Sequence, residues 1–97
     1  MFMKIHRSRE SPEVVAVCDR ELINTTVSNG TISVTITEWF YGNAPVTEEE
    51  IREALRSAGN INLMGERTVS FAIGMGLITK EDCIMIGKIP HVQVYCI

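Results

Sequence analysis

The chain has 97 residues, of which 45% are hydrophobic and 22% are charged, and its formal net charge is −3. This length predicts one small domain, residues 1–97, whose apolar side chains can form a single core without disulfides or a metal ion. The acidic balance argues against a protein that coats nucleic acid or an anionic membrane through its overall charge, but a local basic patch can still bind an anion.

The first elements predicted along the chain are two strands. Residues 1–7 alternate apolar with polar side chains, which is typical of a strand with one buried face. Residues 8–12 are polar and include a proline, so they predict a turn. Residues 14–18 are apolar at every position, as in a central strand that is covered on both sides. We expect these strands to form a hairpin-like pair, followed by a short helical turn that Asp19 caps.

The clearest strand pattern lies at residues 31–37, after a turn predicted at residues 28–30. Isoleucine and valine alternate here with serine and threonine, so one strand face should be buried and the other wet. The aromatic residues 39–41 follow directly, before a loop. We expect them to form a corner of the core, with a stacking platform for a ligand as the alternative.

Two main helices are predicted in the middle of the chain. Thr47 and Glu50 have the spacing of a capping box, which predicts a helix that starts there and stops at Gly59. After an extended segment at residues 60–63, a second helix should open at Gly65 or Glu66 and end near residue 76.

The remaining elements are a capped turn at residues 79–82 and two strands at residues 84–86 and 92–97. Strands therefore come first, then two helices, then strands again. This order predicts an α+β fold: a small two-layer domain in which two main helices cover one face of a mostly antiparallel or mixed sheet of about five strands.

The chain has no predicted membrane span. Its longest uninterrupted apolar run, residues 71–78, is eight residues long and contains two glycines, whereas about 20 apolar residues are needed to cross a bilayer. The first ten residues lack the apolar segment of a signal peptide. We therefore expect a cytoplasmic protein that is not bound to a membrane.

Cysteine and histidine residues give no metal or cofactor signature. Cys18, Cys83 and Cys96 are odd in number, widely spaced and set among aliphatic residues, as buried reduced thiols are. Zinc sites usually include a close pair of ligands, and neither the cysteines nor His6 and His91 supply one. We expect no metal and no cofactor.

The candidate binding residues in the C-terminal half lie at the ends of apolar elements. Free backbone N–H groups at the start of the second helix favour an anion, although Glu66 could itself occupy that place as a cap. His91 and Gln93 share a strand face, where they could recognise a polar ligand or satisfy buried backbone groups. The full set is Asn62, Gly65, Glu66, Arg67, His91 and Gln93.

Basic residues are concentrated in the first strand. Lys4, His6, Arg7 and Arg9 could bind RNA phosphates in a salt-dependent manner, or could simply protect a solvated edge strand by their charge. Lys88 and His91 would extend this patch if the first strand bordered the last one.

Several segments together resemble one protein family: MKIHRS, EVVAVCDREL, WFYG and, above all, NLMGERTVSFAIGMGLI and IPHVQ. They are similar to a small archaeal family, the domain of unknown function 424. The resemblance implies a short, single-domain cytoplasmic protein of archaea, with a loose link to genes of the translation apparatus. It implies no activity and defines no site residues, so the candidates above rest on residue chemistry.

Three functional hypotheses follow. The first is a non-enzymatic binding protein that contacts RNA or a ribonucleoprotein through the basic residues. The second is a small enzyme or ligand-binding domain in which Glu66 is an acid or base, Arg67 holds an anion and His91 transfers a proton. The third is a structural subunit whose threonine-rich strand and last strand pair edge to edge in a homodimer.

Overall fold

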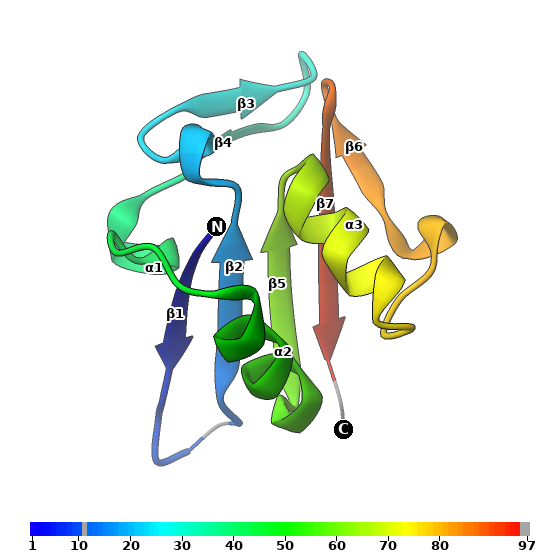
Figure 1. Ribbon diagram of the computed structural model, residues 1–97. Coiled ribbons are helices and arrows are strands. Elements are labelled where there is room, and N and C mark those ends of the chain that lie inside the picture. Colours follow the sequence, from blue (N-terminus) through cyan, green and yellow to red (C-terminus); the bar gives the residue numbers. More distant parts are fainter. Residues whose placement is uncertain (11, 96–97) are drawn as a thin grey trace.

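A computed structural model describes residues 1–10 and 12–95, and it is built around a five-stranded mixed sheet (Figure 1). The parallel pair is β2 with β5, and the other neighbouring strands are antiparallel. The α+β class and the mixed sheet are thus confirmed. The strand order is β1 (Phe2–His6), β2 (Val14–Cys18), β5 (Asn60–Met64), β7 (Ile89–Tyr95) and β6 (Ile84–Ile86).

The two main helices, α2 (Glu48–Ser57) and α3 (Glu66–Gly74), both lie on the same face of this sheet, as Figure 1 shows. They bury an apolar layer against the strands, which fixes their position because each buried aliphatic side chain contributes about 2 kcal/mol. The main buried residues of this layer are Val15, Val17, Ile51, Leu55, Ile61, Leu63, Val69, Ala72, Ile78 and Val92.

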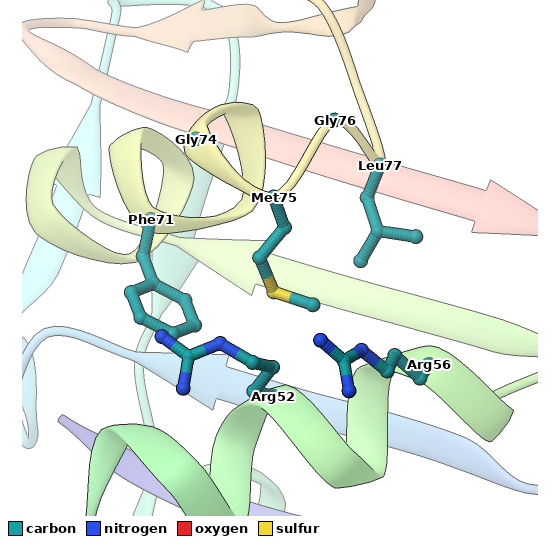
Figure 2. A pocket seen from close by; sticks show the side chains of 7 residues that line it. All are labelled: Arg52, Arg56, Phe71, Gly74, Met75, Gly76 and Leu77. Carbon is teal, nitrogen blue, oxygen red and sulfur yellow. The ribbon is translucent and has the colours of Figure 1, made fainter.

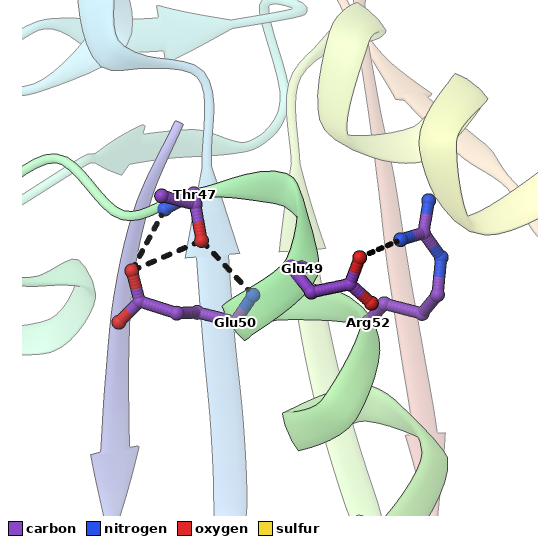
Figure 3. Close-up of polar contacts among 4 residues, drawn as sticks. All are labelled: Thr47, Glu49, Glu50 and Arg52. Carbon is purple, nitrogen blue, oxygen red and sulfur yellow. Dashed lines mark hydrogen bonds and ion pairs between the residues drawn. The ribbon is translucent and has the colours of Figure 1, made fainter.

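The capping box predicted at the start of α2 is confirmed (Figure 3). The Glu50 backbone N–H donates to Thr47 Oγ1 at 3.1 Å, and the Thr47 backbone N–H donates to Glu50 Oε1 at 3.1 Å. Two backbone donors that the helix cannot satisfy are thereby paired. The capped turn expected at residues 79–82 is also present, as the short helix η2 (Lys80–Asp82).

The strand expected at residues 31–37 is shorter than predicted and lies outside the main sheet. β4 (Ser33–Thr35) pairs antiparallel with β3 (Thr26–Ser28), which the sequence did not predict, in a separate two-stranded sheet. β5, which was expected only as an extended segment, is instead a strand of the main sheet. Alternation alone cannot show whether a strand belongs to the main sheet or to a separate hairpin, because it indicates a buried face and not the partner that covers it.

A second apolar layer covers part of the opposite face of the main sheet. It joins β3, β4 and α1 (Glu38–Tyr41) to the strands, so β2 is covered on both sides, as expected. Of the aromatic residues 39–41, Tyr41 is buried in this layer whereas Trp39 is 73% exposed. The buried residues of this layer are Phe2, Ala16, Cys18, Val27, Ile36, Tyr41, Met64 and Ile86.

The last strand differs from its prediction in both extent and place. β7 begins at Ile89 rather than at residue 92, and residues 96 and 97 of the predicted strand, including Cys96, lie outside the described residues. β7 runs between β5 and β6 inside the sheet. β6 pairs only with residues 89–91 of β7, so among the described residues the edge of β7 that faces away from β5 has no strand partner at residues 92–95. A homodimer that pairs edge to edge through the last strand stays a prediction.

Within the described ranges, no helix is long and apolar enough to cross a membrane.

Candidate functional site

The face of the main sheet opposite α2 and α3 carries most of the polar side chains of the strands, and we call it the polar face. The register places Lys4 opposite Ala16, Ala16 opposite Asn62 and Asn62 opposite Gln93. Side chains at facing positions of neighbouring strands point to the same side of a sheet. Asn62 and Gln93, two of the predicted site residues, are therefore neighbours on adjacent strands.

A cavity of about 380 Å³ lies between the polar face and the β3–β4 hairpin. Its polar lining includes Tyr41, Asn62, His91 and Gln93, and most of the other lining residues are aliphatic or aromatic. A few converging polar groups in an apolar hollow are typical of ligand sites. The cavity brings together Asn62, His91 and Gln93 from the predicted set and adds Tyr41, which the sequence analysis assigned to the core.

Tyr41 and Asn62 form the buried polar pair of this cavity. The Tyr41 hydroxyl donates to Asn62 Oδ1 at 2.6 Å. Burial is the main cause that raises the pKa of Tyr41, with the nearby Cys18 thiol second, so the hydroxyl stays protonated at neutral pH. The amide oxygen of Asn62 accepts this bond, and its amide nitrogen can donate to a ligand.

His91 presents an uncharged imidazole to the cavity. Its Nδ1 lies 2.8 Å from the Leu63 carbonyl oxygen, and a carbonyl only accepts, so Nδ1 carries the proton and Nε2 is an acceptor in the neutral ring. Burial lowers the pKa of His91, while the bond to Leu63 acts in the opposite direction. The ring is therefore neutral at pH 7 and offers no positive charge to an anion.

Lys4, His6 and the aromatic helix α1 form the border of the polar face. Lys4 Nζ donates to the Trp39 carbonyl oxygen at 2.7 Å and lies 5.3 Å from the centroid of the Trp39 ring. The His6 ring stacks on Phe40 with centroids 4.7 Å apart, and its Nε2 donates to the Phe40 carbonyl oxygen at 2.7 Å. Phe40 also lines the cavity, so this border adjoins the cavity.

The other predicted basic residues do not form one patch with Lys4. Arg7 pairs with Glu13 at 3.1 Å on the exposed end of β1, and Arg9 is exposed nearby. β1 borders β2 and not the last strand, so Lys88, in the β6–β7 turn, lies at the opposite edge of the sheet. The extension of the patch to Lys88 and His91 is wrong, because it required β1 and β7 to be neighbours.

The predicted anion site at the start of α3 is occupied by a carboxylate of the chain itself. Asp19 accepts from the backbone N–H of Arg67 at 3.1 Å and from the backbone N–H and hydroxyl of Thr68, both at 2.8 Å. From the sequence, Glu66 was the alternative to a bound anion at this end, and Asp19 was expected to cap the turn η1 (Arg20–Leu22), to which its side chain makes no capping bond. Both expectations are corrected, and the helix start has no place for a ligand anion.

Glu66, Arg67 and His91 point into three different environments. Glu66 lines a cavity of about 500 Å³ on the helix side, together with Lys80, Cys83 and Lys88. Arg67 reaches Glu21 at 3.4 Å in an exposed ion pair, and His91 lines the cavity of the polar face. The acid–base arrangement of these three residues is therefore not formed, because general catalysis needs such groups within hydrogen-bond reach of one substrate.

In the part of the chain that the structure describes, no group of three or more His, Cys, Asp or Glu side chains could hold a metal ion.

The fold and the polar face define a small α+β protein with two helices on one side of a five-stranded sheet and a binding-type cavity on the other. Residues 6–97 match the sequence model of a family described as "Protein of unknown function (DUF424)", and the chain belongs to this family. A crystal structure of an uncharacterized conserved protein from Methanopyrus kandleri has a TM-score of 0.81 and 27% identity, covering 99% of this chain and 90% of that one. A search of curated proteins finds no match.

Proposed function

We propose that the protein is a non-enzymatic RNA-binding protein that holds single-stranded RNA at the polar face. The observation that carries this proposal is Trp39, which is 73% exposed beside Lys4 and His6. A tryptophan side chain with this exposure contributes little to the stability of the core. Aromatic rings do stack on unpaired bases, and each such contact contributes about 1–3 kcal/mol to binding. The neighbouring ammonium group can meet the phosphate of the same nucleotide.

The arrangement of the polar face supports contact with more than one base. His6, Val14, Asn60 and Tyr95 form one cross-strand row, in which Tyr95 is 66% exposed at the far end from His6. The two ends of the row are separated by three strand spacings, or roughly 14 Å. The exposed ring of Trp39, beside His6 at one end, and that of Tyr95 at the other suit a short extended strand of RNA whose bases stack separately.

The cavity supports a nucleobase more than a charged ligand. The neutral His91 ring offers an acceptor, the Asn62 amide offers a donor, and Gln93 offers both. A base edge presents donors and acceptors without a formal charge, and its flat ring suits apolar walls such as Phe40. A phosphate would find no cation among these polar groups.

The charge distribution sets the expected salt dependence. Lys4 is the cation at this border, whereas Arg7 and Arg9 lie at the exposed end of β1, where Glu13 already offsets Arg7. About one to two phosphate contacts with a single strand give a slope of about −1 for log K against log salt. The proposal thus predicts weak, salt-sensitive binding. The family resemblance supports placing it in the cytoplasm of an archaeon, near the translation apparatus.

Binding of labelled single-stranded oligonucleotides, transfer RNA and ribosomal RNA by fluorescence anisotropy tests the proposal at low and moderate salt. We expect Trp39→Ala to weaken binding by about tenfold or more, because one stacking platform is lost. Leu77→Ala, an exposed apolar residue on the helix side, is the matched control and should bind as the wild type does. Failure of the wild type to bind any of these RNAs at low salt would refute the proposal.

A further inference from the structure

A second surface, on the other side of the sheet, combines two guanidinium groups with an apolar floor. It is a groove of about 600 Å³ between α2 and the end of α3 (Figure 2), and we call it the arginine groove. It is lined by Arg52, Arg56, Phe71, Gly74, Met75, Gly76 and Leu77. None of these residues belongs to the polar face.

The positive charge of the groove is only partly compensated. Arg52 and Arg56 lie one helical turn apart on α2 and both extend toward α3 in Figure 2. Arg52 Nη1 pairs with Glu49 Oε2 at 3.1 Å (Figure 3), but the Glu49 side chain is largely exposed, so this pair contributes little. Arg56 forms no ion pair with any described residue.

The floor of the groove is apolar and only partly covered. Phe71 and Met75 are half-buried, Leu77 is exposed, and the Arg52 guanidinium lies 5.4 Å from the centroid of the Phe71 ring. A Cβ atom added at Gly74 or Gly76 would meet nothing within 4 Å, so the two glycines leave this wall of the groove open. An exposed apolar strip beside two guanidinium groups, of which only Arg52 has an ion-pair partner among the described residues, is typical of a recognition surface.

We propose that the arginine groove binds a short acidic segment of a partner protein, one that carries both carboxylates and large aliphatic side chains. The carboxylates pair with Arg52 and Arg56, whose planar guanidinium groups can bind a carboxylate through two parallel hydrogen bonds. The aliphatic side chains pack on Phe71, Met75 and Leu77. Charge complementarity and the apolar floor together select this occupant.

An RNA strand fits the groove less well than such a peptide. Its phosphates could meet the two arginines, but its hydrated backbone would leave the Met75 and Leu77 side chains without an apolar partner. The groove also lies on the opposite side of the sheet from the polar face. A peptide in the groove and RNA at the polar face can therefore bind at the same time, and the two proposals stand independently.

The test uses a fluorescently labelled peptide of glutamate and leucine residues, with two control peptides in which glutamine replaces glutamate or serine replaces leucine. We expect the acidic, apolar peptide to bind the wild type and both controls to bind at least about tenfold more weakly. Amide NMR shifts on titration should concentrate in the two helices, at Arg52, Arg56, Phe71 and the glycines.

Matched charge variants locate the binding. The double variant Arg52→Gln/Arg56→Gln should lose about tenfold or more in affinity, whereas Arg20→Gln/Lys80→Gln removes the same charge elsewhere and should bind as the wild type does. Leu77→Ser, which leaves both arginines in place, should also weaken binding.

Absence of peptide binding to the wild type would overturn the proposal. Equal binding by the double variant or by the glutamine peptide would do the same, and so would RNA, rather than peptide, shifting the groove amides.

Discussion

The Asp19 carboxylate occupies the space that a side chain at Gly65 would fill, at the start of α3. Gly65 has φ of +112°, and a Cβ atom placed there would lie 2.7 Å from both carboxylate oxygens of Asp19. Asp19 is 5% exposed and is held by N–H and O–H donors of the first turn of the helix. The glycine thus makes room for the carboxylate that caps the helix, and the two residues join β2 to α3.

Replacement of Gly65 by alanine should destabilise the protein strongly. The new methyl group would clash with the Asp19 carboxylate. In addition, alanine would have to adopt the positive φ of this position, which residues with a side chain rarely do. We expect the free energy of unfolding in urea to fall by more than about 2 kcal/mol. Gly30→Ala is the control, because Gly30 also has positive φ but a Cβ atom there meets nothing within 4 Å, so its loss should be smaller.

Loss of the Asp19 cap should cost about 2 kcal/mol. Asp19→Ala leaves the Arg67 and Thr68 backbone donors unpaired at a buried helix start, whereas Asp19→Asn keeps an acceptor oxygen and should lose less. Urea unfolding of both variants measures the difference. Equal stability of Asp19→Ala and the wild type would contradict a capping role.

Local sequence patterns predict much of the fold because both partners of each signal lie within a few residues. The capping box of Thr47 and Glu50 and the strands β1, β2 and β6 were recognised in this way. Asp19, in contrast, caps a helix that starts more than forty residues further on, and no local pattern reports such a pairing. The same limit explains β4, whose alternation was visible but whose partner was not.

The candidate site was predicted in part for a related reason. Asn62 and Gln93 were chosen for their polarity, and they face each other because β5 and β7 pair in one register. Glu66 and Arg67 lie in the same short sequence motif as Asn62, but they follow β5, where the chain has already turned into α3 on the helix side of the sheet. Proximity in sequence therefore did not mean a shared surface.

Removal of the Tyr41 hydroxyl should lower the stability of the protein through the lost bond to Asn62, while the packing of the core is kept. Tyr41→Phe keeps the buried ring but leaves Asn62 Oδ1 without its donor, which should cost about 1–2 kcal/mol in the free energy of unfolding. Tyr95→Phe is the matched control, because Tyr95 is 66% exposed and its hydroxyl can bind water instead. A similar small loss in both variants would show that the buried bond is not important for stability.

His91 should make stability depend on pH in mildly acidic solution. Burial lowers its folded pKa below the ordinary value of 6.5, so between these two pKa values the unfolded chain binds more protons than the folded one. Stability should therefore be constant with respect to His91 above pH 6.5 and fall as the pH drops toward the folded pKa. Urea unfolding from pH 7.5 to pH 5 measures this change, and His91→Gln should reduce it; His6→Gln serves as the comparison.

The two cysteines in the described part of the chain should differ in reactivity. Burial, with the Asp19 carboxylate second, raises the pKa of Cys18 to about 12, and the thiolate is the reactive form. The pKa of Cys83 is also raised, chiefly by burial, but its side chain is partly exposed at the edge of the helix-side cavity. Alkylation of the native protein at pH 8, followed by peptide mass analysis, should modify Cys83 well before Cys18. In urea the two should react at similar rates, and early modification of native Cys18 would show that β2 opens easily.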